Sequence, residues 1–124
     1  LPVHQTAQPT FPHQRLEAYR VALELAAAAQ QLSAAIPRGH RSVADHMLRA
    51  ATNTVLLLAE GADRRGAGEK RQRFVESRAE CGEVAAAAEL AVVLGFVTPV
   101  RAATVQRLAN RVAAMLTRLL QRLG

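Results

Sequence analysis

The stretch from Leu56 to Lys70, LLLAEGADRRGAGEK, decides how this chain folds, because it reads as the end of one helix, a corner and the start of the next. Two of its glycines, Gly61 and Gly66, superficially resemble the spacing of a phosphate-binding loop. Such a loop needs Lys and then Ser or Thr directly after its second glycine, and it follows a strand. Here an alanine and a third glycine follow, and no strand-like alternation precedes. The stretch therefore predicts a tight corner between two helices, with glycines that ease the turn.

Helix-breaking and helix-capping residues divide the rest of the chain. Pro37 disfavours helix at the residue before it, and Ser42 then fits an N-cap position, with Asp45 three residues on as a variant capping box. Farther on, Gly95 suits the position just after a helix, and the pair Thr98–Pro99 suits the cap and first position of another. These signals predict helices over residues 13–35, 42–61, 69–94 and 99–123.

Apolar residues recur at helical spacing inside these segments. The first helix is expected to bury a stripe formed by Leu16, Tyr19, Leu23, Ala26, Ala27 and Gln30. The last helix is expected to bury a stripe formed by Val105, Leu108, Val112, Leu116, Leu119 and Leu123. No segment alternates with a period of two for long enough to be a strand. Four helices joined by short corners predict an all-α fold, an antiparallel up-down-up-down four-helix bundle.

Composition limits the size and setting of the domain. The chain has 124 residues, no Trp and only 3% aromatic residues, so its core is expected to consist of Leu, Val and Ala. Residues 1–12, with three prolines, are expected to form a flexible tail, and residues 13–124 the bundle. The single cysteine, Cys81, excludes an internal disulfide, and no apolar run reaches the roughly 18–20 residues of a membrane span. These features predict a cytoplasmic protein without membrane contact.

Charge is unevenly distributed. The net charge is +6, and residues 63–124 supply most of it, with ten Arg and one Lys against six acids. No acid occurs from Thr98 onward, and at about 100° per residue four arginines of the last helix fall within about 60° of one another: Arg107, Arg111, Arg118 and Arg122. We call these four the arginine ridge. The corner adds a second basic group: Arg64, Arg65, Lys70 and Arg71.

The third helix carries the opposite pattern, an acidic stripe of Glu69, Glu76, Glu80 and Glu83. Three interpretations of the two stripes are open. Both can be solvated faces, or they can pair with each other between helices or subunits, where single exposed pairs contribute little. Alternatively the arginine ridge binds phosphates in a salt-sensitive way that is blind to sequence. The absence of acids from the last helix favours the third.

Catalytic and metal-binding patterns are not expected in this chain. The four histidines are scattered, and no HxxxH, Glu-x-x-His or CxxC spacing occurs. Cys81 has no base placed beside it and is expected to be a small buried hydrophobe. Glu60 follows an apolar stretch, so it is expected to be held by a basic partner, either Arg64 one turn on or a group from another helix or subunit. No enzyme activity, metal or cofactor is predicted.

Four segments carry a family resemblance: LEAYRVALELA, LRAATNTVLLLAEG, ADRRGAGEKRQRF and SRAECGEV. Over residues 11–120 the chain resembles the bacterial 23S ribosomal RNA intervening-sequence proteins, which are related to accessory variability proteins of diversity-generating retroelements. The family usually reads Asn-Ile-Ala-Glu-Gly where this chain has Leu57, Leu58, Ala59, Glu60 and Gly61. The resemblance implies a four-helix bundle assembled as a ring, typically a homopentamer. It also implies basic surfaces that contact nucleic acid, in one branch a reverse-transcriptase partner, and no established enzymatic activity.

These observations lead to one functional prediction and one alternative. We expect a non-enzymatic homo-oligomer that binds RNA or DNA through the arginine ridge, helped by the four basic residues of the corner. Leu57, Leu58, Glu60 and Gly61 are expected to have structural or subunit-contact roles, because the apolar end of the second helix suggests burial on more than one side. The alternative is a scaffold or protein-interaction module, such as a reverse-transcriptase accessory, that does not itself bind nucleic acid.

Overall fold

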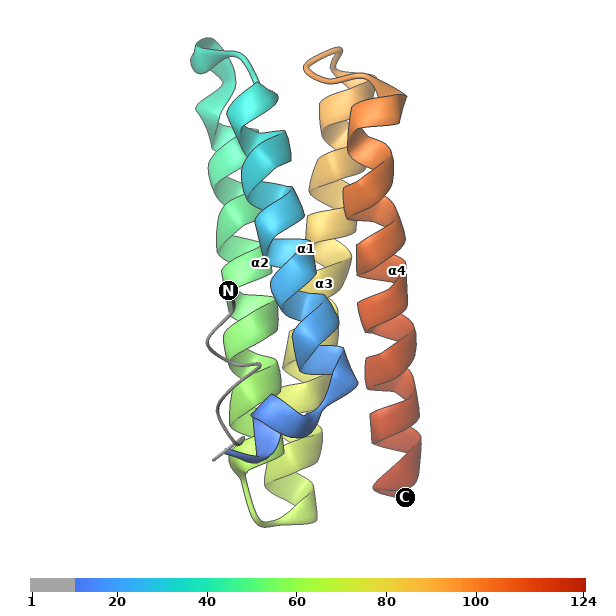
Figure 1. Ribbon diagram of the computed structural model, residues 1–124. Coiled ribbons are helices and arrows are strands. Elements are labelled where there is room, and N and C mark those ends of the chain that lie inside the picture. The colour runs from blue at the N-terminus through green and yellow to red at the C-terminus, as the bar shows by residue number, and fades with distance from the viewer. Residues whose placement is uncertain (1–10) are drawn as a thin grey trace, which may run out of the picture.

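Four antiparallel helices make up the computed structural model, which describes residues 11–124 (Figure 1). The helices are α1 (Glu17–Ala35), α2 (Arg41–Asp63), α3 (Ala67–Val93) and α4 (Pro99–Arg122), with short 3-10 turns η2 (Pro12–Arg15) and η3 (Arg38–His40). Each helix packs against its neighbour in sequence, and α1 packs against α4, which closes the bundle. The predicted all-α, up-down-up-down bundle is confirmed. Within the described residues, none of these helices combines the length and the apolar character needed to cross a membrane.

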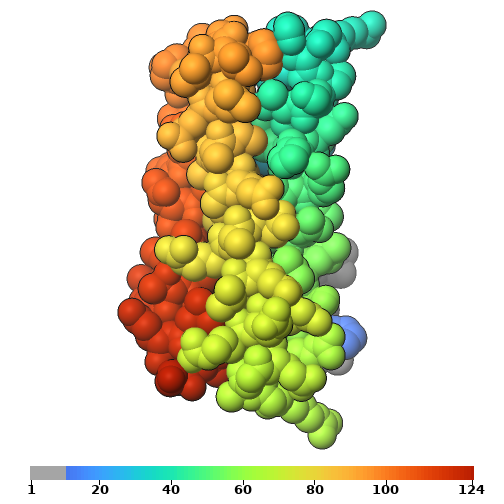
Figure 2. All heavy atoms as spheres, turned by 180° about the vertical axis from the view of Figure 1, so that it is seen from behind, coloured from blue at the N-terminus to red at the C-terminus, as the bar shows by residue number. Residues whose placement is uncertain are grey.

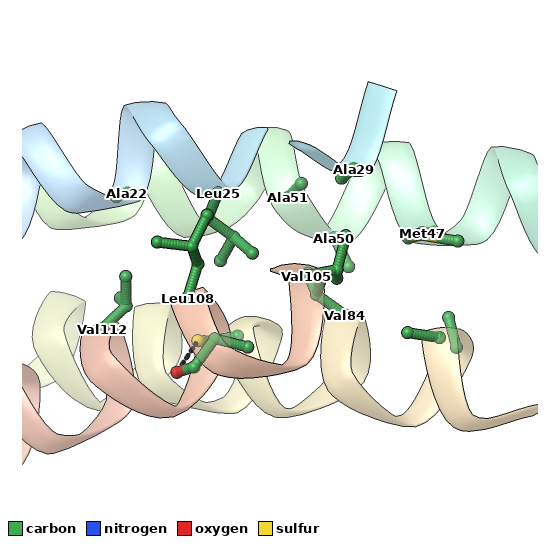
Figure 3. Close-up of a cluster of buried hydrophobic side chains, with 14 of the residues drawn as sticks. Ala22, Leu25, Ala29, Met47, Ala50, Ala51, Val84, Val105, Leu108 and Val112 are labelled. Atoms are coloured by element: carbon green, nitrogen blue, oxygen red, sulfur yellow. Dashed lines mark hydrogen bonds between the residues drawn. The ribbon is translucent and has the colours of Figure 1, made fainter. Parts of the chain in front are cut away.

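Small and aliphatic side chains fill the core, as the composition predicted (Figure 3). Leu25 and Met47 are fully buried together with Val105 and Val112, and alanines such as Ala22 lie between them. Because alanine lets helix backbones approach closely and has the best helix propensity, an alanine-rich core suits a narrow bundle. On α4, Val105, Leu108, Val112 and Leu116 are buried as expected, while Leu119 and Leu123 at its end are partly buried.

The first helix differs from its prediction at its start. Residue 13 was expected to begin a continuous helix, but the chain makes the turn η2, passes through extended backbone at Leu16 and begins α1 at Glu17. The side chain of Asp63, at the end of α2, accounts for the break: it accepts a hydrogen bond from the His13 backbone N–H at 3.1 Å and lies 2.9 Å from the His13 ring nitrogen Nδ1. Residues 1–10 of the predicted tail lie outside the described residues.

The buried face of α1 also differs from its prediction. Leu23 is 46% exposed, and Ala27 and Gln30 lie at the surface. The residues that face the core are instead Ala18, Val21, Ala22, Leu25, Ala29 and Leu32. Leu16, Tyr19 and Ala26 of the predicted stripe are partly buried against the core, so the buried face is rotated around the helix from the predicted one. The rotation brings Val21 and Leu25 to the centre of the contact with α2 and α4.

The start of α2 has a different cap from the predicted one. Helix α2 begins at Arg41, directly after η3, and its N-cap residue is His40, which makes no side-chain capping bond. The predicted box of Ser42 and Asp45 therefore lies inside the helix and is wrong. Pro37 explains the shift, because it starts the 3-10 turn that leads straight into the helix.

The corner between α3 and α4 is confirmed in detail. Gly95 has a φ of +78°, a conformation that side chains disfavour. The N–H of Phe96 donates to the Ala91 carbonyl at 2.8 Å, and the N–H of Gly95 donates to the carbonyl of Val92 at 3.0 Å, which is a Schellman motif. The hydroxyl oxygen of Thr98 then accepts from the Arg101 N–H at 3.2 Å, so Thr98 is the predicted cap of α4.

Gly61 lies inside α2 and not in the corner, which corrects its predicted role in the turn. A Cβ built at this position would lie 2.7 Å from ring carbons of Phe74 on α3, closer than real contacts allow. The corner itself, residues 64–66, has no residue with positive φ; among the described residues only Gly95 and Gly124 do. Gly61 is therefore needed for the close approach of α2 and α3.

Two glycine substitutions test this packing. Gly61→Ala is expected to lower the free energy of unfolding by about 1–3 kcal/mol, because the added methyl group overpacks the contact with the buried Phe74 ring. Gly82→Ala is the matched control: this glycine is within α3, is exposed and has no atom within 4 Å of a built Cβ. It should raise stability by about 0.5–1 kcal/mol through helix propensity. Urea unfolding followed by circular dichroism measures both, and equal effects would contradict the contact.

Candidate nucleic-acid interface

The arginine ridge lies on the outer face of α4. Its four members, Arg107, Arg111, Arg118 and Arg122, are all exposed, because the apolar stripe of α4 occupies the opposite side of the helix. Within residues 11–124, none of the four lies within 4.0 Å of a carboxylate or donates a side-chain hydrogen bond. The ridge therefore presents four guanidinium groups that no acid of the described chain neutralises.

The acidic stripe of α3 does not meet this ridge. Glu76 accepts hydrogen bonds from Gln72 at 2.9 Å and Arg73 at 2.8 Å, and these bonds, in that order, lower the pKa of its carboxyl. Glu83 lies 3.4 Å from the Nε2 atom of His46 on α2. Two members of the stripe thus have partners on α3 itself and on α2, whereas Glu69 and Glu80 form no ion pair within residues 11–124. Figure 2 shows α3 lying between α2 and α4 on this side of the bundle.

The basic corner lies at the same end of the bundle as the end of the ridge. Arg64 and Arg65 are exposed, and their side chains form no ion pair in the described part of the chain. Figure 1 places the α2–α3 corner and the C-terminal end of α4 at one end, and Figure 2 shows the corner protruding there. The hydrogen bond from Arg71 Nη2 to the Leu120 carbonyl, 3.3 Å long, ties the start of α3 to the end of α4.

Lys70 has a structural contact that the sequence did not reveal. Its Nζ atom donates to the carbonyl of Ala62 at 2.8 Å and to that of Gly61 at 3.3 Å, and its side chain is partly buried. These carbonyls belong to the last turn of α2, where helix groups lack intrahelical partners and attract a cation. Lys70 therefore caps α2, although the sequence grouped it with the residues that contact nucleic acid.

Lys70→Met tests the cap. Removing the ammonium leaves two carbonyls at the end of α2 with weaker partners, so the free energy of unfolding is expected to fall by about 1 kcal/mol. Arg65→Met removes the same charge from an exposed side chain and should stay within about 0.5 kcal/mol of the parent. Thermal and urea unfolding of the three proteins give the comparison; a loss shared by both variants would point to net charge and not to the cap.

Glu60 is exposed, not buried, and its partner is not Arg64. Its side chain is 44% exposed, and Glu60 Oε1 lies 3.8 Å from the Nε atom of Arg73 on α3, so the expectation of a partner on another helix is correct. Arg73 links α3 to α2 through this contact and also pairs with Glu76 on its own helix, a role that its position at the edge of the acidic stripe did not disclose. Leu58 is buried in the chain's own core, and Leu57 is partly buried.

Cys81 is the small buried hydrophobe that the sequence predicted. Its Sγ atom donates to the carbonyl of Ala109 at 3.2 Å, and burial raises the pKa of the thiol from 9.0 to about 11, partly offset by the nearby charge of Arg78. A thiol in this state is a poor nucleophile, since thiolate is the reactive form. Among residues 11–124, no three His, Cys, Asp or Glu side chains gather closely enough to hold a metal ion.

The raised pKa of Cys81 predicts a pH dependence. Between about pH 9 and pH 11 the unfolded chain ionises this thiol while the folded chain keeps it protonated. The thiol's contribution to stability is therefore complete below pH 9 and is lost as pH rises through that window. Thiolate absorbance in the native protein should appear only above the pH at which it appears in urea. Ionisation of both states at one pH would contradict the burial.

Comparisons with known proteins add a family and a fold. A family model described as 23S rRNA-intervening sequence protein matches residues 14–118. Among solved structures, the chain is similar to a protein of unknown function from the S23 ribosomal protein family of Bacteroides thetaiotaomicron, with a TM-score of 0.78 and 13% identity over 83% of this chain and 97% of that one. At that identity the likeness shows the fold alone. No curated protein matches the sequence.

Proposed function

We propose a function from the premise that this chain belongs to the 23S rRNA-intervening sequence protein family: it binds nucleic acid electrostatically through the arginine ridge of α4. The observation that carries the proposal is the ridge itself, four exposed arginines without an acidic partner among residues 11–124. Unpaired guanidinium groups bind phosphates and release counterions, which gives affinity without sequence preference. The chain then acts as a binding protein and not as an enzyme.

The basic corner extends this surface around one end of the bundle. Arg64 and Arg65 are free to contact phosphates, while Arg71 and Lys70 add charge but already donate hydrogen bonds to helix carbonyls. We further propose that the protein works in the cytoplasm as a homo-oligomer, a pentamer by the family resemblance. Several copies of the ridge in one particle would multiply the phosphate contacts and raise the avidity. A reverse transcriptase is a candidate protein partner on the same resemblance.

Charge reversal on the ridge tests the proposal. Arg107→Glu/Arg111→Glu should weaken binding of labelled RNA and DNA about tenfold or more at low salt, and should reduce the slope of log affinity against log salt by about 2, because two phosphate contacts are lost. Fluorescence anisotropy across a salt series measures both quantities. Helix content should be unchanged, since both residues lie outside the core.

The matched control changes the same charge elsewhere. Arg38→Glu/Arg49→Glu also lowers the net charge by four, from +6 to +2, at exposed positions in η3 and α2. Helix α2 does not pack against α4. The control should bind within about threefold of the parent at equal salt. Equal losses in both double variants would assign binding to net charge, and no binding by the parent at low salt would overturn the proposal.

A second candidate function, a protein scaffold, is favoured by exposed apolar side chains. Leu56 on α2 and Val75 on α3 are 58% and 50% exposed. Apolar groups that face solvent on neighbouring helices suit contact with another protein or another copy. If the parent protein binds no nucleic acid at low salt, this candidate takes the place of the first, and the oligomer should keep its mass at high salt because apolar contacts are not screened.

A further inference from the structure

The arginine ridge consists of two pairs and is not a continuous row. Arg107 and Arg111 are four residues apart, about 6 Å along the helix axis, and so are Arg118 and Arg122. The midpoints of the two pairs are separated by eleven residues, or about 16 Å. Between the pairs the exposed position on this side of α4 is Ala114, which carries no charge and little bulk. Positive charge is therefore concentrated at two places on one rigid helix.

Resting on the proposed function, we propose that this ridge selects double-helical nucleic acid, with one arginine pair on each of the two strands that border a groove. The major groove of B-form DNA is about 12 Å across, and the phosphate groups on its rims add to that distance. A separation of about 16 Å between pairs suits two backbones on either side of such a groove. Ala114 then faces the open groove, where no phosphate is available to bind.

The aromatic side chains argue against a single strand as the preferred ligand. Proteins that bind single strands stack the bases on exposed aromatic rings. This chain has three Phe, one Tyr and no Trp, and none of them is on α4. Phe74 is buried, and Phe96 stacks on His40 at 4.1 Å. Phe11 is 56% exposed, but it lies with Tyr19 against the ring of His13, at the turn η2 that packs on α2 and α1 and not on α4. The ridge therefore offers charge without a stacking platform, which fits backbone contacts to a duplex.

The rest of α4 favours the same conclusion. The helix packs against α1 on one side and α3 on the other, and its core stripe is buried, so its outer strip is held in a fixed geometry. The backbone positions of the four arginines are therefore fixed before binding, so only their side chains need to be ordered. A duplex has a regular backbone, whereas a single strand must be ordered by the protein at a cost in entropy.

Competition between duplex and single strand tests the inference. Labelled duplexes of about 20 base pairs, longer than the roughly 22 Å span of the ridge, are compared with their own single strands by anisotropy at equal salt. RNA duplexes and DNA duplexes are measured separately, which shows whether the preferred ligand is RNA or DNA. The duplex is expected to bind at least about tenfold more tightly than either strand. Equal or tighter binding of the single strand would overturn the inference and leave the proposed function intact, whereas no binding of any form overturns the proposed function itself.

A variant in the gap gives an independent readout. Ala114→Arg turns the two pairs into a continuous row. A single strand that follows the row should gain affinity, by severalfold for one added phosphate contact. A duplex that spans the groove should change by less than about twofold, because the new side chain faces no phosphate. A matched addition of charge, Thr52→Arg, at an exposed site on α2, which lies away from the ridge, corrects for net charge. A larger gain for the duplex at position 114 than at position 52 would contradict the two-strand geometry.

Discussion

The contact between the Phe74 ring and the backbone of Gly61 determines how closely α2 and α3 approach, and the other contacts between these two helices depend on it. With no Cβ at Gly61, the ring fits where a methyl group would overlap it. At this separation the buried Ser77 hydroxyl donates to the Thr54 carbonyl at 2.7 Å, and Arg73 reaches Glu60 on the facing helix. The same proximity lets Lys70 reach the last turn of α2 across the short corner. The close packing of α2 and α3 thus brings these polar side chains within reach of their partners. The resulting hydrogen bonds pair polar groups that would otherwise be buried without a partner.

The C-terminal end of each helix has a specific partner for its free carbonyls. Arg41 donates to the Ser33 and Ile36 carbonyls at the end of α1, Lys70 caps α2, and Arg71 donates to the Leu120 carbonyl of α4. Gly95 ends α3 without a cation, by a left-handed turn. Three of the basic side chains therefore serve helix ends, where a cation is favoured by the helix dipole. A count of basic residues in the sequence cannot separate these three from the arginines that remain free.

Local signals in the sequence predicted the features that depend on neighbouring residues. The helix content, the Gly95 turn, the Thr98–Pro99 cap and the burial of Cys81 follow from propensity, capping and periodicity, and all are present. One local signal failed, because the 3-10 turn after Pro37 places the start of α2 before the expected cap at Ser42. The other wrong predictions concern contacts between segments far apart in sequence. Leu23 faces solvent because the packing of α2 and α4 rotates the buried face of α1 toward Val21 and Leu25, and residue 13 leaves the helix because Asp63, fifty residues on, binds it. In the candidate interface, helical spacing alone predicts that the arginine ridge is exposed. The capping role of Lys70 could not be predicted from the sequence, because it depends on how the fold places the end of α2 beside the start of α3.

The residues of α4 that stabilise the fold and the residues of the proposed binding surface lie on opposite faces of the helix. The ridge residues can therefore vary without disturbing the core. The apolar stripe that includes Val112 and Leu116 holds the helix in place, while the ridge arginines touch no other side chain in an ion pair within the described residues. Exposed charges of one sign on a helix repel one another and contribute nothing to packing. The fold therefore does not require four arginines on this strip, since uncharged polar residues would serve solubility as well. Helix α4 has 24 residues, with five arginines and no acid, so its exposed charges repel one another. A polyanion that binds the ridge would neutralise these charges and remove the repulsion.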